Sequence, residues 1–502
     1  MDREAPQDLG ARLRARATAR PDGVALSDGD SSITWAQLDA RVDAAAAALQ
    51  GLGVGTDDRV ALVVSDGDTF VEVAIATARC GGVLVPLLVD LAPDELRHAL
   101  SDSGARVVVA GPPRAAELRA LGVRARVIDT DSLDDDGWRA RCREAGRPTT
   151  VERGPDDLAV LFYTSGTSGR PRGAMLTRAN LAANQDQSHA GRLRVTADDV
   201  VLVTVPLAHV YAFTVGLGVA ITAGATLVAP GRVDPPTALR IAESTRATAI
   251  VTTPAVLTAW LDADDLDAAN LSALRIVASG ASPLGMQTIE RFRQRTGRSI
   301  TEGYGLTEAS PSVAATSMTD DAPPGSVGLP LPGVEIRLVG EDGSDVVGGD
   351  VGEIWVRGPN VFRGWWNDAR ATARSLTEDG WLRTGDAGTR DEHGMLYLVD
   401  RLRDLVIVDG FSVFPGEVER VVVEDLSVHS AAVVGTPHPV TGEAIVAYVV
   451  AAPGATIDVD ALMARCSGRL ARYKCPARIE VVDALPYTAS GKVRRMVLRD
   501  ES

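Results

Sequence analysis

One segment of the sequence combines small, hydroxyl-bearing and basic side chains in a way that suits phosphate binding. Residues 163–173, YTSGTSGRPRG, continue an apolar segment and contain three glycines, four serine or threonine residues and two arginines, Arg170 and Arg172. Glycines allow backbone N–H groups to turn toward an anion, hydroxyls add donors, and arginine neutralises phosphate charge. The GxxxxGK[ST] pattern of a Walker A loop is absent. An ordinary surface loop has a similar composition, but the position directly after a predicted strand favours a phosphate-binding loop.

Two further groups of residues have the chemistry to bind a metal ion and a ribose. Residues 302–308, EGYGLTE, form a predicted small-residue loop in which Glu308 offers a hard oxygen ligand for Mg²⁺ and Tyr304 an aromatic face for a base. Residues 380–386, GWLRTGD, place Asp386 after a predicted tight turn, where a carboxylate can accept hydrogen bonds from ribose hydroxyls. The simpler explanations are a solvated glutamate, a core tyrosine and an aspartate in an Asx turn.

Two charged segments complete the set. Residues 400–404, DRLRD, carry charges of both signs at a predicted domain boundary, and Lys492 lies in a predicted turn, SGK, within a basic segment. Lysine is a point charge on a flexible stem, which suits it to charge that develops on a phosphate or a carboxylate. Taken alone, an exposed charged loop and a surface lysine are the simpler explanations.

Alternating strand and helix patterns must position these segments. Thr34 and Gln37 have the spacing of a capping box, which predicts a helix that runs to about Gln50. The apolar face of that helix consists of Leu38, Val42, Ala45 and Leu49. Strands are predicted at residues 59–65, 83–86, 106–110, 248–254 and 274–280, and helices at residues 70–79 and 93–102. This alternation predicts a mostly parallel α/β sheet.

The pattern changes after Pro323 to short strands divided by turn residues. Strands predicted at residues 334–340, 352–358, 395–400 and 405–410 indicate an antiparallel β subdomain. An α+β unit follows, with helices predicted at residues 416–424 and 459–470, strands at residues 431–434 and 444–451, and a final strand. We therefore expect a large N-terminal α/β domain over residues 1–400, a hinge at 401–404 and a small α+β domain over 405–502.

The composition disfavours several classes of protein. With 51 basic and 67 acidic residues, the net charge of −16 opposes binding to nucleic acid and to anionic membranes. No apolar run approaches the roughly 18 residues of a membrane span, the N-terminal residues lack the apolar region of a signal peptide, and the four cysteines form no CxxC pair. These features predict a cytoplasmic protein with reduced thiols. The basic residues between Arg469 and Arg499 predict a region that can receive an anionic ligand.

Together, and in this order, the five motifs resemble those of the adenylate-forming superfamily. Its members are acyl- and aryl-CoA synthetases, adenylation domains of peptide synthetases, and luciferases. The resemblance extends from about Ile33 to Arg499. It implies a large N-terminal domain and a small mobile C-terminal domain, with the active site between them.

The resemblance also implies roles for the matching residues. Positions that match the family's nucleotide site are Thr164, Ser165, Gly166, Thr167, Ser168, Gly169, Gly280, Ala281, Tyr304, Gly305, Thr307, Asp386, Arg401 and Lys492. Positions that match catalytic residues are Thr164, His209, Glu308 and Lys492. By this resemblance, Glu308 binds Mg²⁺, Asp386 and Arg401 contact ribose, Lys492 bridges carboxylate and phosphate, and Arg403 is the hinge residue.

The sequence departs from the family at one position and narrows the subfamily at another. Arg172 stands where the phosphate loop usually has lysine, which keeps the charge but not the shape. Residues 206–218, PLAHVYAFTVGLG, contain no acidic residue to hold a substrate ammonium, so an α-amino acid is disfavoured. This stretch is similar to acyl-CoA synthetases, where His209 would line the pocket near the carboxylate.

The resemblance therefore implies an acyl-CoA ligase that uses ATP, Mg²⁺, coenzyme A and a small carboxylic acid. Adenylation would come first, followed by transfer of the acyl group to the thiol. A carrier-protein phosphopantetheine thiol or an amine is the alternative acceptor. A nucleotide-binding regulatory protein without catalysis is a further alternative.

Overall fold

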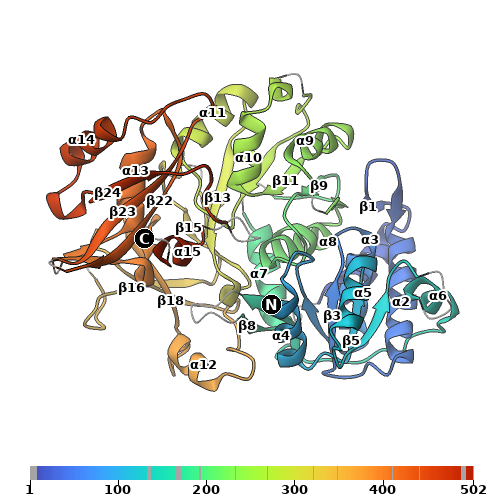
Figure 1. Cartoon of the computed structure of the whole chain (residues 1–502). Coiled ribbons are helices and arrows are strands. Elements are labelled where there is room, and N and C mark those ends of the chain that lie inside the picture. Colours follow the sequence, from blue (N-terminus) through green and yellow to red (C-terminus); the bar gives the residue numbers. More distant parts are fainter. Residues whose placement is uncertain are drawn as a thin grey trace. The chain divides into compact units, whose positions relative to one another are not determined.

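The computed structural model describes residues 8–132, 137–164, 171–191, 194–231, 233–267, 269–319, 321–346, 349–409, 411–439, 441–487 and 493–500. The chain forms two compact units, residues 1–335 with 356–382 and residues 336–355 with 383–502. Figure 1 colours the chain from blue at the start of the first unit to red at the end of the second. Within the described residues, no helix is both long enough and apolar enough to cross a membrane.

The first unit contains a six-stranded sheet built largely from parallel strands. Its order is β6-β5-β3-β4-β7-β8, and β8 runs antiparallel to β7. The strands are β3 (Arg59–Val63), β4 (Val83–Pro86), β5 (Val107–Ala110), β6 (Arg126–Asp129), β7 (Leu158–Thr164) and β8 (Arg172–Thr177). Strands β3, β4 and β5 are almost entirely apolar because helices cover parallel sheets on both faces.

The first unit also contains a nine-stranded sheet. Its order is β15-β14-β13-β12-β11-β9-β10-β1-β2, and the neighbours from β13 to β1 are parallel. The strands are β1 (Val24–Ser27), β2 (Ser32–Thr34), β9 (Val200–Val203), β10 (Thr226–Val228), β11 (Ala249–Thr252), β12 (Ile276–Ser279), β13 (Ile300–Gly305), β14 (Ser312–Ala315) and β15 (Leu329–Pro330). The predicted mostly parallel α/β architecture is confirmed.

Helices pack around these sheets and begin where the sequence offers caps. They are α1 (Leu9–Ala19), α2 (Trp35–Gly51), α3 (Asp68–Arg79), α4 (Pro93–Ser103), α5 (Pro112–Ala120), α6 (Trp138–Glu144), α7 (Arg178–His189), α8 (Val219–Ala223), α9 (Pro235–Ser244), α10 (Pro254–Leu261), α11 (Met286–Thr296) and α12 (Ala369–Ser375). A π-helix, Ala212–Gly218, leads into α8. The predicted capping box is present, since Gln37 N donates to Thr34 Oγ1 at 3.2 Å and Thr34 N to Gln37 Oε1 at 3.0 Å. The predicted apolar face of α2 is fully buried.

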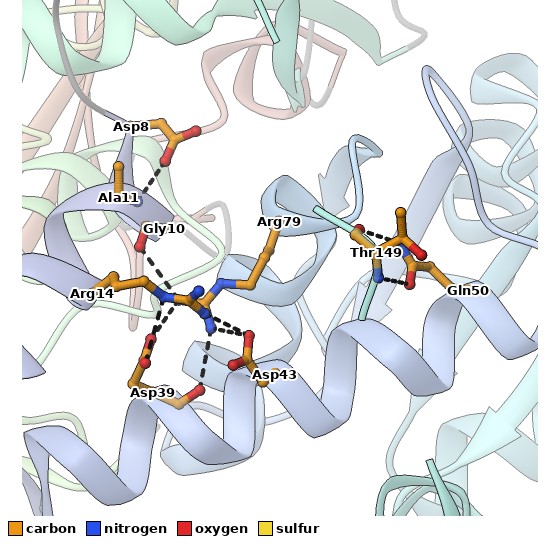
Figure 2. A network of polar contacts seen from close by, with 9 residues as sticks. All are labelled: Asp8, Gly10, Ala11, Arg14, Asp39, Asp43, Gln50, Arg79 and Thr149. Atoms are coloured by element: carbon orange, nitrogen blue, oxygen red, sulfur yellow. Dashed lines mark hydrogen bonds and ion pairs between the residues drawn. The ribbon is translucent and has the colours of Figure 1, made fainter. Parts of the chain in front are cut away.

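Arg79 joins the first three helices through a buried guanidinium, as Figure 2 shows. It donates from α3 to the carboxylates of Asp39 at 2.6 Å and Asp43 at 2.7 Å on α2, and to the carbonyl of Gly10 on α1 at 3.3 Å. Arg14 adds a second bond to Asp43 at 2.7 Å. The side chain of Arg79 is only 7% exposed, so these partners satisfy a charge that burial would otherwise penalise.

The second unit contains two sheets. A four-stranded sheet has the order β16 (Glu335–Val339), β17 (Gly352–Arg357), β18 (Leu382–Arg390) and β19 (Leu396–Arg401). The other sheet consists of β20 (Val406–Val408), β21 (Phe411–Val413), β22 (Val428–His438), β23 (Gly442–Ala451) and β24 (Arg478–Val481). Its helices are α13 (Pro415–Val423), α14 (Val459–Arg469) and α15 (Arg495–Asp500).

Two predictions for this part of the chain are wrong. Residues 405–410 were expected in the antiparallel β subdomain, but β20 pairs with β21 and β23 because Val406 and Val408 belong to the core of the second sheet. The tight turn expected before Asp386 lies inside strand β18, where Gly385 has a φ of 70°. Pairing with β19 holds this polar, glycine-containing segment as a strand. The hinge at 401–404 and the domain bounds drawn from it stay predictions.

Candidate active site

The carboxyl ends of parallel strands lie side by side along one edge of the nine-stranded sheet. In the register of the sheet, Thr252 pairs with Ser279, and Ser279 pairs with Glu302. Open α/β sheets bind ligands in the crevice outside these carboxyl ends. The predicted site residues at this edge either follow β9, β12 or β13, namely His209, Gly280, Ala281, Thr307 and Glu308, or end β13, namely Tyr304 and Gly305.

Close contacts with neighbouring atoms explain two glycines of this edge. A Cβ added to Gly280 would lie 2.8 Å from the ring of Tyr211, whose hydroxyl donates to the carbonyl of Ala278 at 3.1 Å. A Cβ at Gly305 would lie 2.2 Å from the carbonyl oxygen of Pro311, the residue before β14. Ala281 has a φ of 70°, a left-handed conformation that costs a non-glycine residue roughly 1–2 kcal/mol. The edge is thus lined by main chain in an unusual conformation.

The imidazole of His209 has a defined orientation. Its Nδ1 accepts a hydrogen bond from the backbone N–H of Tyr211 at 3.2 Å. Its own backbone N–H donates to Pro206 at 2.8 Å, and its carbonyl accepts from Phe213 at 2.9 Å. With Nδ1 accepting, a neutral ring carries its proton on Nε2.

Residues 302–308 form the end of a strand and a single helical turn. Glu302 to Gly305 lie in β13, so the prediction of a loop over the whole motif is wrong, since pairing with β14 extends the strand. Tyr304 is 6% exposed. Thr307 and Glu308 are half-buried in a 3₁₀ turn. The carbonyl of Glu308 accepts from the backbone of Phe362 at 2.8 Å, which holds the turn in place.

The stem of the predicted phosphate loop is a hairpin, while the loop itself, Ser165 to Gly169, lies outside the described residues. Thr164 ends β7 and pairs with Arg172 at the start of β8. Arg172 Nε lies 3.4 Å from Asp368 Oδ2, the carboxylate that also caps α12. Arg172, which stands where the family usually has lysine, is therefore engaged with a carboxylate at the end of the hairpin next to the loop.

In the second unit, Asp386 and Arg401 form a cross-strand pair. They face each other in the register of β18 and β19, and Arg401 Nε lies 3.1 Å from Asp386 Oδ1. Asp386 is 6% exposed, and its backbone N–H donates to Thr384 Oγ1 at 3.1 Å. The pair holds a buried carboxylate beside a partly exposed guanidinium. Lys492 lies outside the described residues.

The basic segment near the C-terminus is less available to an anion than the sequence predicts. Four of its cations are paired with carboxylates: Arg469 with Glu424, Lys474 with Glu417, Arg478 with Glu480, and Arg495 with Glu419. These pairs weaken the argument that the segment provides a general receiving surface for a polyanion. Three of the four carboxylates, Glu417, Glu419 and Glu424, belong to α13 or follow it directly and lie outside the segment, so residue counts along the segment could not reveal them.

Two carboxylates near the site were missed by the sequence analysis. Asp66 follows β3 and accepts a hydrogen bond from the backbone of Leu207 at 2.9 Å, which joins the edges of the two sheets next to His209. Its second oxygen is buried without a hydrogen-bond partner. Burial raises the pKa of Asp66 to about 7, and burial also raises the pKa of Glu302 to about 7. The available signal for Asp66 was its place directly after a buried parallel strand.

Replacing Asp66 with asparagine is expected to stabilise the protein at neutral and alkaline pH. The amide oxygen still accepts from Leu207, and the buried charge is removed. Because the folded-state pKa lies above the unfolded value, the stability that Asp66 contributes at low pH is lost as pH rises through about 7. Urea unfolding measures the free energy of unfolding of Asp66→Asn relative to that of the unchanged protein. This difference should increase by about 2–3 kcal/mol in favour of the variant between pH 5 and pH 8. Asp30 is exposed, so the control Asp30→Asn should show no such increase in the free energy of unfolding with pH. An equal increase in both variants would contradict the raised pKa of Asp66.

Family models and known proteins match this chain along nearly its whole length. A family model described as AMP-binding enzyme matches residues 13–366, and one described as AMP-binding enzyme C-terminal domain matches residues 417–492. A feruloyl-CoA synthase from Amycolatopsis sp is 36% identical over 498 residues, which cover 98% of this chain and 99% of that protein. The structure of ATP-bound MatB from Rhodopseudomonas palustris matches with a TM-score of 0.93 and 33% identity over 98% of both chains. The amide bond synthetase McbA from Marinactinospora thermotolerans matches with a TM-score of 0.88 and 30% identity over 98% of this chain and 99% of that one.

Proposed function

We infer that this chain, which belongs to the AMP-binding enzyme family, is an AMP-forming acid–thiol ligase. It activates a carboxylic acid with ATP and passes the acyl group to coenzyme A. The observation that carries this conclusion is the end-to-end match with a CoA-forming relative, which includes both the large family domain and the C-terminal domain. The absence of an acidic residue in 206–218 supports an acid without an α-amino group.

The reaction has two halves. An oxygen of the acid attacks the α-phosphorus of ATP, the bond to the β-phosphate breaks, and pyrophosphate leaves. The thiolate of coenzyme A then attacks the acyl carbon, and AMP leaves with the electrons of the carbon–oxygen bond. The first half brings two anions together, so it depends on positive charge and N–H donors aimed at the developing charge.

The site residues have the following proposed roles. Thr164 and the loop from Ser165 to Gly169 hold the phosphates, Thr307 adds a hydroxyl donor, and Lys492 bridges the carboxylate and the α-phosphate. Tyr304 and the segment Gly280–Ala281 bound the adenine and the acid, and Gly305 gives close access to the main chain. His209 presents Nε2–H to the acid. Asp386 and Arg401 contact the ribose hydroxyls.

The donor chemistry of three site residues suits a magnesium ion. The half-buried carboxylate of Glu308 and the hydroxyls of Thr164 and Thr307 are hard oxygen donors of the kind that Mg²⁺ prefers, together with phosphate oxygens. When bound there, Mg²⁺ would neutralise charge on the phosphates of ATP. Glu308 is held in position by the backbone bond from Phe362.

An amine or a carrier-protein thiol is the alternative acceptor. The likeness to an amide bond synthetase supports the amine, because the fold accommodates that reaction. We also propose that residues 405–502 act as a mobile lid, that residues 401–404 are its hinge, and that the protein works in the cytoplasm. The acid is proposed to be a monocarboxylate with an apolar aliphatic or aromatic body.

Analysis of products tests the proposed reaction. Purified protein with MgATP, coenzyme A and a panel of ferulate, benzoates and fatty acids should release AMP and pyrophosphate and form an acyl-CoA, detected by mass spectrometry. Parallel reactions contain a holo carrier protein or an amine in place of coenzyme A. Acyl-AMP that accumulates with saturating coenzyme A, without thioester for any acid, would refute the assigned acceptor.

A further inference from the structure

The ends of the segment that contains Lys492 are joined at a defined stem. Tyr487 and Val493 form an antiparallel bridge, and Arg494 N donates to the carbonyl of Pro486 at 2.7 Å. Helix α15 begins at the next residue, Arg495, only three positions after Lys492. The position of α15 therefore sets the position of one side of the stem.

Arg495 fastens the start of α15 to three other elements of the same unit. Its Nη2 donates to Glu419 Oε1 on α13 at 2.7 Å, and its Nε donates to the carbonyl of Val433 on β22 at 3.3 Å. Its Nη1 lies 3.5 Å from Asp404 Oδ2, directly after the proposed hinge residue. Figure 1 shows α13, α15 and β22 together in orange and red. One guanidinium thus joins the segment after β19, α13, β22 and α15.

A backbone hydrogen bond to Glu419 and nearby carboxylates both strengthen the contacts of Arg495. Glu419 Oε1 also accepts a hydrogen bond from the backbone N–H of Val433 at 2.7 Å, which holds the carboxylate in place independently of Arg495. Burial opposes the charge of Arg495, but the carboxylates of Glu419, Asp400 and Asp404 outweigh burial and raise its pKa. A planar guanidinium spreads five N–H donors over a fixed fork and can reach two carboxylates and a carbonyl on different elements, whereas the donors of lysine all lie on one nitrogen.

We propose that Arg495 is a positioning residue for adenylation: it holds the stem of the Lys492 segment and the end of the hinge, Asp404, as one rigid block. Lys492 then moves with the hinge instead of independently of it. This inference rests on the proposed function, because it assigns the catalytic charge to Lys492. The neighbouring Arg494 is exposed and supplies a matched control.

Half-reactions catalysed by the whole 502-residue chain test this role. Arg495→Ala should lower the kcat for pyrophosphate release by about 10–100-fold, with KM for ATP and acid within about threefold, because misplacement of a reacting group costs rate more than binding. Thioester formation from synthetic acyl-AMP should fall by less than about threefold. Arg494→Ala should stay within about twofold in both reactions. Arg495→Lys should restore only part of the adenylation rate, since one of the three contacts returns.

A double variant separates positioning from charge balance. Glu419→Gln with Arg495→Met removes both buried charges, so no unpaired carboxylate of Glu419 is left behind. Adenylation should stay low in this variant if Arg495 positions Lys492, and recovery to the normal rate would overturn the inference. If Arg495→Ala forms acyl-AMP at the normal rate while Lys492→Ala forms none, the positioning role of Arg495 is wrong and the proposed function still stands. Normal adenylation by Lys492→Ala would instead overturn the proposed role of Lys492 and the inference with it.

Discussion

Lys492→Ala is expected to abolish acyl-adenylate formation while most of the transfer from preformed acyl-adenylate to coenzyme A survives. Adenylation joins a carboxylate to a phosphate, and the ammonium is proposed to bridge the two anions as charge develops. Loss of one such electrostatic contact costs roughly 100–1,000-fold in rate. The transfer reaction starts from a mixed anhydride that already contains the bond Lys492 helps to form, so it has less need of that charge.

The composition of the chain strengthens this expectation. Among 51 basic residues only two are lysines, Lys474 and Lys492. Arginine provides the other 49 basic residues, including position 172 beside the predicted phosphate loop. Lysine at 492 therefore suggests a need for a compact, mobile ammonium that a planar guanidinium does not meet.

The measurement compares pyrophosphate release from ATP and acid with thioester formation from synthetic acyl-AMP. Lys492→Arg should lose adenylation nearly as fully as Lys492→Ala, because charge is kept and shape is not. Lys474 serves as the matched control, since its Nζ donates to both carboxylate oxygens of Glu417, at 2.7 and 2.8 Å. Lys474→Arg should leave pyrophosphate release unchanged. Equal losses in both half-reactions for Lys492→Ala would contradict the assignment.

Local signals predicted those elements whose own residues decide their structure. Helix α2 follows from the capping pair Thr34 and Gln37 and from an apolar face at helical spacing. Strand β4 was predicted with its observed bounds, Val83–Pro86, because its residues are apolar and turn residues precede it. In both cases the pattern needs no partner to be recognised.

The features that the sequence analysis did not predict depend on contacts between residues far apart in the sequence. Strand β18 contains arginine, threonine and two glycines, and it is a strand because it pairs with β17 and β19. Asp66 meets Leu207 across 141 positions of sequence, and the pairs of the basic segment join it to α13. The motif residues His209, Gly280, Tyr304 and Glu308 were found individually, but their common edge follows from the strand order of the nine-stranded sheet.

Arg403→Pro is expected to spare adenylation within about threefold and to reduce acyl transfer by at least about tenfold. Arg403 is the middle residue of the 3₁₀ turn Leu402–Asp404. In the first turn of a helix the N–H groups lack intrahelical partners, so proline fits the described conformation. Proline also fixes φ near −65°, and a hinge that must change its backbone angles between the two half-reactions then cannot do so.

The surrounding contacts indicate what a rotation at Arg403 would change. Asp404 stays with Arg495 on the lid side, whereas Asp400 accepts from the backbone N–H of Gly416 at 2.6 Å across the proposed pivot. Rotation would have to break that second contact. Arg403→Lys and Arg403→Ala keep backbone freedom and should transfer acyl groups within about threefold of the normal rate. Rapid-quench measurement of acyl-AMP and thioester distinguishes the steps, and a proline variant that forms thioester at the normal rate would place the hinge elsewhere.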